Sequence, residues 1–303
     1  MRWKPKRKTW LWILTGIVVA IVILLVGISA YMGHVFTTAT PMPVEGTPDD
    51  IGLTYEDVEF PSRIDELTLS GWFLPAEDSD DVIIMLHGND YHRADPSIHM
   101  LDIAAELVAN DYNVLSFDLR GHGESEGTKI SRGYYEKRDL LGAIDYLKSE
   151  GYEDIGVLAF SMGAGITLTT AAENDDIDAI VSDACFANFG EIVSSEMSRQ
   201  YKIPTFLSYP IFSFIKLFYR VDIRAISPIN CIDDVAPTPV LFIHGVDDET
   251  TPSSHSERLY EAYDNANGQL WLVPGATHVR SYETEPEEYI NRVTTFFDAV
   301  FKL

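Results

Sequence analysis

The sequence is poor in cysteine and in basic residues. Its 303 residues include two cysteines, Cys185 and Cys231, which are too few for a disulfide-dense scaffold and lack metal-ligand spacing. The two cysteines could pair in one disulfide or remain small buried thiols. Lysine and arginine number 22 against 47 aspartates and glutamates, a formal net charge of −25. This balance argues against nucleic acid as a partner, because binding phosphate requires a basic surface.

Other signals are also missing. The chain has no internal repeat, no low-complexity tract, no glycine-rich phosphate loop and no His/Glu/Asp spacing typical of a metal site. We therefore expect neither a metal nor a cofactor. Hydrophobic residues make up 46% and charged residues 23%, which is ordinary globular usage and excludes wholesale disorder.

The N-terminal segment has no acidic residue before Glu45, and an apolar run free of charge extends from Trp10 to Met32. The segment before this run carries five basic residues: Arg2, Lys4, Lys6, Arg7 and Lys8. Twenty-three helical residues span roughly 34 Å, enough for a hydrocarbon core of about 30 Å. We predict an uncleaved, single-pass transmembrane signal anchor in residues 1–33. The positive-inside tendency then places the rest of the chain outside the cell membrane.

A cleaved signal peptide is the alternative, with Ile28-Ser29-Ala30 as a weak cleavage site. Its apolar region would normally be about 7–15 residues, which is shorter than the run found here. Without the five basic residues of the anchor, 17 remain against 47 acidic ones, a net charge of −30 on the outer part. This charge is typical of a solvated surface.

Residues 34–52 hold Thr, Pro, Gly and Asp without periodicity and are predicted to form a tether. Residues 53–303 alternate strand-like and helix-like segments, which indicates an α/β fold. The runs rich in Val, Ile and Leu lack polar alternation, so the sheet should be covered on both faces. We expect a mostly parallel central sheet of about eight strands with helices on both faces. Residues 187–229 contain no clear strand and are predicted to be a helical cap insertion.

Three polar residues follow predicted strands in an order that indicates nucleophilic catalysis. Ser161 lies in Ala159-Phe160-Ser161-Met162-Gly163, between a buried strand and a helix, as a nucleophile elbow requires. Asp248 lies in the His244–Pro252 segment after the 240–243 strand, and His278 follows the next strand. The order Ser, Asp, His, each just past a strand, is the one that α/β-hydrolases use.

The sequence resembles the α/β-hydrolase family over about residues 53–303, and within it the bacterial membrane-anchored or exported serine hydrolases labelled as esterases or serine aminopeptidases. Further matching pieces are Leu86-His87-Gly88, the run from Asp118 to Ser125, and the H-G-x-x-D-x-x-T-P segment. In place of the first glycine of the usual G-x-S-x-G motif stands Ala159, which is still small. The resemblance implies that His87, Asp118, Arg120 and His122 set loop structure.

The resemblance assigns the catalytic roles residue by residue. Ser161 would be the nucleophile, and His278 the general base and then the general acid. Asp248 would orient His278; Asp247 and Asp183 are the alternative positions for this acid. The family places the oxyanion hole at two backbone N–H groups, which here belong to Met162 and Asn89.

The predicted insertion is densely aromatic between residues 206 and 219. Three interpretations remain open: it packs on the edge of the sheet, it lines an acyl pocket, or part of it dips into the outer leaflet. Under the second, Phe206, Tyr209 and Phe212 would contact the substrate. Under either functional interpretation the substrate is apolar, such as a small-molecule or lipid-like ester.

Taken together, the sequence predicts a membrane-anchored, extracytoplasmic serine hydrolase that cleaves carboxylic esters, in the manner of a carboxylesterase. A peptidase or an acyltransferase would use the same acyl-enzyme intermediate. From another class, a catalytically idle surface domain retained for binding a partner is the alternative. The presence of all three residues in register argues against it.

Overall fold

The structure is a computed structural model that describes residues 7–77, 79–263 and 266–302. Its centre is an eight-stranded sheet in the order β1-β2-β4-β3-β5-β6-β7-β8. The strands are β1 (Glu56–Pro61), β2 (Thr68–Leu74), β3 (Val82–Leu86), β4 (Asn113–Phe117), β5 (Ile155–Phe160), β6 (Ala179–Asp183), β7 (Val240–Gly245) and β8 (Gln269–Val273). β1 and β2 form the antiparallel edge, and the remaining strands run parallel.

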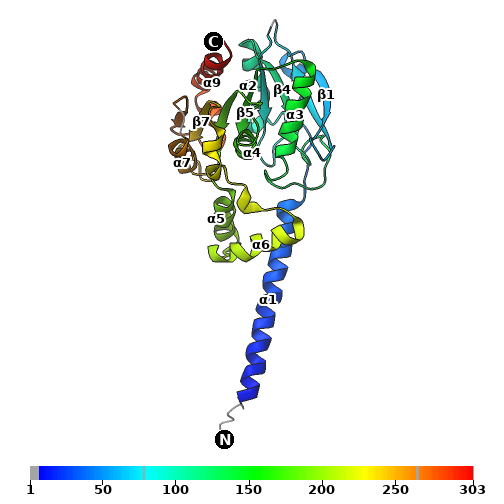
Figure 1. The fold of residues 1–303 in the computed structure, drawn as a ribbon, viewed down its shortest axis with the longest axis vertical. Helices are drawn as coiled ribbons and strands as arrows, with labels where there is room; N and C mark the ends of the chain where they lie inside the picture. The colour runs from blue at the N-terminus through cyan, green and yellow to red at the C-terminus, as the bar shows by residue number, and fades with distance from the viewer. Residues whose placement is uncertain (1–6, 78, 264–265, 303) are drawn as a thin grey trace.

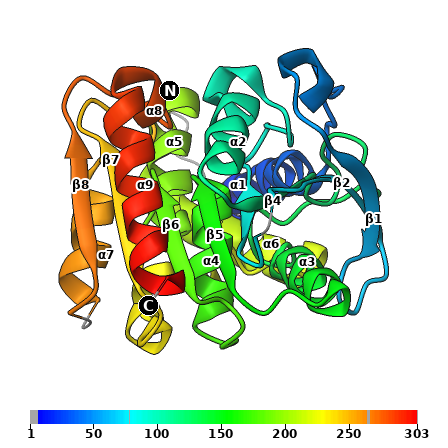
Figure 2. The same cartoon turned by 90° about the horizontal axis from the view of Figure 1, so that it is seen from above.

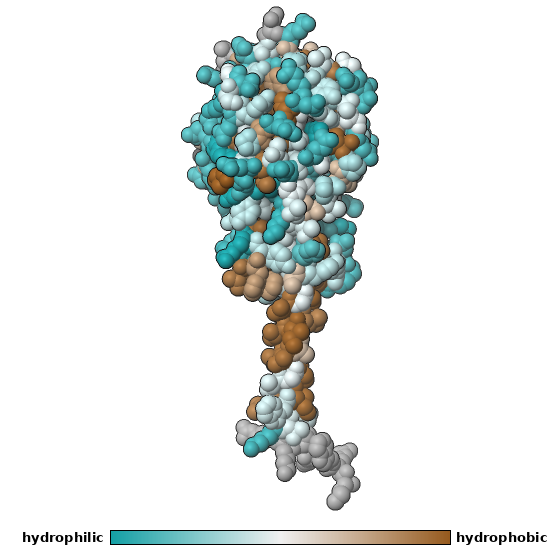
Figure 3. All heavy atoms as spheres, turned by 90° about the vertical axis from the view of Figure 1, so that its right-hand side faces the viewer, coloured by the Kyte–Doolittle hydropathy of each residue, from teal (hydrophilic) through white to brown (hydrophobic). Residues whose placement is uncertain are grey.

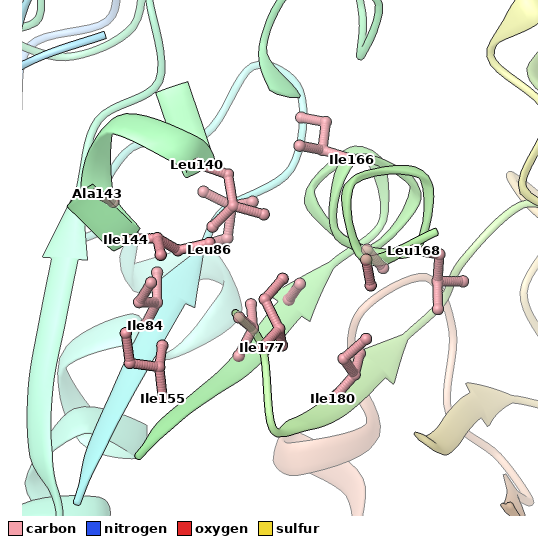
Figure 4. Packing of buried hydrophobic residues seen from close by; sticks show 14 of the residues in the cluster. Ile84, Leu86, Leu140, Ala143, Ile144, Ile155, Ile166, Leu168, Ile177 and Ile180 are labelled. Atoms are coloured by element: carbon pink, nitrogen blue, oxygen red, sulfur yellow. The ribbon is translucent and has the colours of Figure 1, made fainter. Parts of the chain in front are cut away.

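Helices cover both faces of the sheet, as Figure 2 shows. One apolar cluster joins the sheet to α3 (Lys137–Glu150), α4 (Met162–Ala171) and α7 (Ser254–Ala262). The other joins it to α2 (Met100–Ala109) and α9 (Pro286–Phe301), with the short α8 (Ser281–Thr284) before α9. Figure 4 shows Leu140 and Ile144 of α3 packing over Ile84 and Leu86 of β3, and Leu168 of α4 belongs to the same cluster. The predicted fold class is confirmed.

The insertion between β6 and β7 is helical. It contains α5 (Phe189–Tyr201), α6 (Ser208–Tyr219) and four short 3₁₀ helices: Thr205–Leu207, Ile223–Ala225, Pro228–Asn230 and Ile232–Val235. A third apolar cluster holds α5 and α6 together through Val193, Met197, Ile211, Phe212 and Ile215, all buried. The insertion therefore has a small core of its own.

The N-terminal helix α1 (Arg7–Thr37) projects from the domain as a single rod (Figure 1). Its stretch Lys8–Thr37 is long and apolar enough to cross a membrane, and its most apolar window is unburied. Beyond it, a short 3₁₀ helix (Pro48–Ile51) precedes β1. The helix runs past residue 33 and into the segment expected to be a tether, and the division of the chain at residues 33 and 52 remains a prediction.

The outer end of α1 packs against α6, which lies across it (Figure 1). The Tyr219 hydroxyl donates a hydrogen bond to the Ala30 carbonyl at 2.8 Å, and Met32 is buried among the cap residues. Gly33 makes this approach possible, because a Cβ there would lie 2.4 Å from the Tyr219 ring. The cap and the N-terminal helix therefore form one packed unit.

Candidate active site

The turn between β5 and α4 raises Ser161 out of the sheet. Ser161 has φ 50° and ψ −109°, a strained backbone conformation that rarely occurs outside functional sites. Its N–H donates to the Asp183 carbonyl of the neighbouring strand at 2.8 Å, which fixes the turn. Two residues on, Gly163 lies so close to β3 that a Cβ would be 2.5 Å from the Leu86 carbonyl oxygen. Glycine at position 163 is therefore a packing requirement.

His278 connects Ser161 to a carboxylate. Its Nε2 lies 2.9 Å from Ser161 Oγ, and its Nδ1 lies 2.6 Å from Asp248 Oδ2. A carboxylate only accepts hydrogen bonds, so Nδ1 carries the proton. Nε2 then presents its lone pair to the Ser161 hydroxyl. This is the tautomer that a general base needs.

The Asp248 carboxylate is buried and fully hydrogen-bonded. Oδ1 accepts from the backbone N–H groups of Thr250 and Thr251, both at 2.8 Å. Oδ2 accepts from His278 and lies 3.2 Å from Nε2 of His244. Burial alone would raise the pKa of Asp248, but hydrogen bonds from His244 and His278 outweigh it and hold that pKa well below the usual range. Asp248 is therefore ionised beside His278.

His244 is a site residue that the sequence analysis missed. Its Nε2 donates to the Thr251 carbonyl at 2.7 Å and lies near Asp248, and its Nδ1 is 2.6 Å from the Ser256 hydroxyl. It thereby fixes the loop that carries Asp248. The four-residue spacing between His244 and Asp248 in H-G-x-x-D was the available signal.

The two alternative acids lie elsewhere. Asp247 is exposed on the surface, although its N–H bonds the Ala276 carbonyl at 2.9 Å. Asp183 is buried, and its Oδ1 accepts from the Ser281 hydroxyl at 3.3 Å. Burial raises the pKa of Asp183 to about 6. The structure thus brings Ser161, His278 and Asp248 together.

A pocket of about 300 Å³ opens over Ser161 and His278. Asn89 and Met162 both line it. Met162 is the first residue of α4, where backbone N–H groups lack partners within the helix and the helix dipole favours negative charge. Gly88 passes so near that a Cβ there would lie 3.3 Å from Ser161 Cβ. Both positions predicted for the oxyanion hole therefore border the pocket.

The apolar wall of this pocket comes from the start of the insertion: Phe186, Phe189 and Ile192. Phe206, Tyr209 and Phe212, predicted as substrate contacts, lie elsewhere. They line a separate cavity of about 850 Å³ between α5 and α6. Phe212 is buried in the core of the cap, whereas Phe206 and Tyr209 are about two-thirds exposed.

His87 and His122 support the loops around the site. His87 Nε2 accepts from the Leu119 N–H at 3.0 Å, and its Nδ1 bonds the Gly88 carbonyl at 2.7 Å. Burial, aided by neighbouring His122, lowers the pKa of His87 well below its ordinary value. His122 bonds the Arg120 carbonyl at 3.0 Å. Neutral His87 therefore ties the end of β3 to the loop after β4.

Asp118 and Arg120 hold the same loop through ion pairs. The Asp118 carboxylate accepts from the Arg93 N–H at 2.8 Å and pairs with its guanidinium. Arg120 pairs with Asp139 and Asp65, both at 2.7 Å. These groups fix the loop and lie outside the set of residues that line the pocket over Ser161.

The two cysteines are free thiols, Cys185 buried and Cys231 partly buried. Burial raises the pKa of Cys185 to about 12. Among the residues that the structure describes, no group of three or more His, Cys, Asp or Glu side chains is arranged to hold a metal ion.

The parallel sheet, the strained serine turn and the Ser-His-Asp line define an α/β-hydrolase fold. Residues 77–205 match the family model described as serine aminopeptidase, S33. The chain is 32% identical to the uncharacterised Bacillus subtilis protein YqkD, over 76% of this chain and 75% of the relative. The chain belongs to the α/β-hydrolase family.

Two further similarities concern hydrolases. The crystal structure of the Pyrococcus furiosus esterase Pf2001 superposes with a TM-score of 0.72 at 30% identity, over 86% of this chain and 99% of the esterase. The zebrafish lysophosphatidylserine lipase ABHD12 is 29% identical over 61% of this chain and 48% of the lipase. The esterase and lipase relatives support a hydrolase.

Proposed function

We propose that this protein is a membrane-anchored serine hydrolase that cleaves carboxylic esters through an acyl-enzyme intermediate. The observation that carries the proposal is the continuous hydrogen-bonded line from Ser161 through His278 to Asp248, at the base of a pocket. A serine hydroxyl is a weak nucleophile until an oriented base accepts its proton. Here the base lies within 2.9 Å, and the buried carboxylate orients it.

The chemistry follows from these contacts. Ser161 Oγ attacks the ester carbonyl carbon while its proton passes to His278 Nε2. The negative charge that develops on the carbonyl oxygen is stabilised by the N–H groups of Met162 and Asn89. The tetrahedral intermediate collapses, and the leaving alcohol takes the proton from His278. Water then repeats the cycle on the acyl-serine ester and releases the acid. Asp248 stabilises the transient imidazolium.

The apolar wall of the pocket supports an ester with an acyl chain as substrate. Full-length protein in detergent should hydrolyse 4-nitrophenyl esters, and kcat/KM should rise from acetate toward medium chains. Each buried methylene is worth about 0.8 kcal/mol, or up to about fourfold. A rate independent of chain length, or no hydrolysis by folded protein, would contradict an acyl-binding pocket.

A peptidase is the second candidate, because the matching family model carries the description serine aminopeptidase. Leucine 4-nitroanilide distinguishes the two activities. An esterase should cleave the anilide at least 100-fold more slowly than the best ester, and the reverse ranking would favour the peptidase.

The N-terminal helix and the cap support a position on the outer face of a membrane. α6 contacts α1 near Ala30 and Met32, at the end of the apolar run. Large apolar side chains of the cap are exposed at this level: Phe206, Tyr209, Leu217 and Phe218. Figure 3 shows apolar surface continuing from the rod onto the adjoining end of the domain. Amphipathic aromatic rings favour the interface.

The charge of the cap supports the same arrangement. Residues 187–229 carry five basic residues and three acidic residues, whereas residues 34–303 as a whole carry 17 against 47. The five are Arg199, Lys202, Lys216, Arg220 and Arg224, and all are exposed. A basic, aromatic face suits anionic lipid headgroups, which the acidic remainder of the domain repels.

Spin-label depth measurements test this position of the cap. A nitroxide at Phe218→Cys, in full-length protein with its own cysteines replaced and reconstituted in bilayers, should relax several-fold more with oxygen than with a water-soluble nickel chelate. The control Asn291→Cys lies on α9, at the end of the domain away from α1 (Figure 1), and should show the reverse. Equal nickel access at both positions would leave the cap in water.

A further inference from the structure

Arg132 sits on a turn that is held unusually firmly. Its φ is 58°, and Gly133 follows with φ 114°. The Glu136 carboxylate, fully buried, accepts hydrogen bonds from the N–H and hydroxyl of Ser131, both at 2.6 Å, and from the N–H of Gly133 at 2.7 Å. Holding a non-glycine residue such as arginine in the left-handed backbone conformation costs free energy, which the surrounding structure has to offset. The turn therefore fixes the direction in which the Arg132 side chain leaves the backbone.

That side chain lines the same pocket as Ser161 and His278. Arg132 is the only lysine or arginine among the described residues that form the pocket. Its side chain is 17% exposed, and its ion-pair partner is Asp90, at 3.8 Å and itself 70% exposed. Its Nε also lies 3.5 Å from the Phe36 carbonyl, near the end of α1. Both contacts are long for hydrogen bonds.

Other buried arginines of this protein are paired much more closely. Arg93 contacts the carboxylates of Asp118 and Glu124, and Arg120 those of Asp139 and Asp65. For Arg132, burial lowers the pKa, and the attraction of Asp90 and Glu136 offsets this only in part. A guanidinium has five N–H donors in a planar fork that matches carboxylate and phosphate. Arg132 thus carries donor capacity that its protein neighbours leave unused.

We propose that Arg132 binds an anionic group of the substrate, a carboxylate or a phosphate, so that the preferred substrate is a negatively charged ester. The inference rests on the proposed ester hydrolysis at Ser161. The anionic group can belong to a lipid headgroup at the membrane surface or to a soluble ester. A lipid headgroup and a soluble ester present the same kind of anionic oxygen to the guanidinium, so only an experiment distinguishes these two sources.

The test compares matched charged and neutral substrates in full-length protein reconstituted in bilayers of neutral lipid. The lipid pair is 1-oleoylglycerol 3-phosphate and 1-oleoylglycerol, and the soluble pair is mono-4-nitrophenyl glutarate and 4-nitrophenyl butyrate. Arg132→Gln should lower the ratio of kcat/KM, charged over neutral, by about 10- to 100-fold, the usual effect of losing a charged hydrogen bond. Arg132→Lys should retain part of the ratio. The pair with the larger change identifies the source of the anion.

Lys129→Gln is the control, because Lys129 is exposed near the end of α1 and lies outside the pocket. It should leave both ratios unchanged. An unchanged ratio in Arg132→Gln overturns the proposal, as does an equal fall in Lys129→Gln, which would indicate bulk attraction of anions. A similar loss on charged and neutral substrates in both Arg132 variants would assign Arg132 to structure. If wild-type protein hydrolyses neither pair and resists fluorophosphonate, the proposed function itself fails.

Discussion

Replacing Ser161 with alanine is expected to remove all fluorophosphonate labelling and to lower kcat for ester hydrolysis by about 10⁶-fold, the usual loss when a serine nucleophile is deleted. The fluorophosphonate phosphorus reacts only with a hydroxyl whose proton has a nearby acceptor. In this protein that acceptor is His278 Nε2, 2.9 Å from Ser161 Oγ. Intact mass of the full-length protein in detergent should show one adduct on the wild type and none on Ser161→Ala. His278→Ala should be as inactive.

The matched control is Ser149→Ala, on the exposed end of α3, which should label like the wild type. Loss of activity in Ser161→Ala should come without loss of fold, because the hydroxyl contributes one partly buried hydrogen bond. Activity close to wild type in both Ser161→Ala and His278→Ala would contradict the assignment. A folded wild type that takes no adduct would favour the idle binding domain.

The buried strands could be predicted almost residue for residue. β3 and β5 begin and end where the apolar runs do, because parallel strands buried on both faces leave no polar position to blur the pattern. The opening hairpin was less regular. β1 begins only at Glu56, after a 3₁₀ helix that ends at Gly52 in the left-handed conformation, so the residues from 53 to 55 do not belong to the strand.

Only the part of the candidate site that follows from the order of the strands could be predicted from the sequence. Residues at the carboxyl ends of neighbouring parallel strands meet at one edge, which is why Ser161, Asp248 and His278 lie together. The sequence did not predict a place in the site for His244 or Arg132, for two different reasons. The role of His244 depends on how the loop to Asp248 folds back, and that of Arg132 on a turn which a carboxylate four residues on holds in place.

The side of the cap that faces the pocket could not be predicted. Phe206 and Tyr209 are as apolar as Phe186 and Phe189, and only tertiary packing decides which pair borders Ser161. Phe186 and Phe189 border the site because they lie just before and at the start of α5. The cap leaves Phe206, just before α6, and Tyr209, in the first turn of α6, exposed, and α6 packs against α1.

The second large effect is expected at Asp248. Asp248→Asn keeps the size of the side chain but replaces an acceptor by an amide that can donate toward His278. The proton of the imidazole would then lie on Nε2 instead of Nδ1. Nε2 would present an N–H to Ser161 and could not accept the serine proton. A loss of about 10⁴-fold in kcat is the usual result of this tautomer error. Ester hydrolysis and the rate of fluorophosphonate labelling should fall together.

Asp247→Asn is the matched control, since it removes the same charge from the adjoining, exposed residue. Its activity should stay within about threefold of the wild type. Asp248 also accepts hydrogen bonds from two backbone N–H groups and contacts His244, so the substitution could lower stability as well as activity. A thermal unfolding scan must therefore accompany the kinetics. A larger loss in Asp247→Asn than in a folded Asp248→Asn would move the acid to the neighbouring position. Near-normal activity in Asp247→Asn and Asp248→Asn, together with a large loss in Asp183→Asn, would instead identify Asp183, which accepts a hydrogen bond from Ser281, as the acid of the triad.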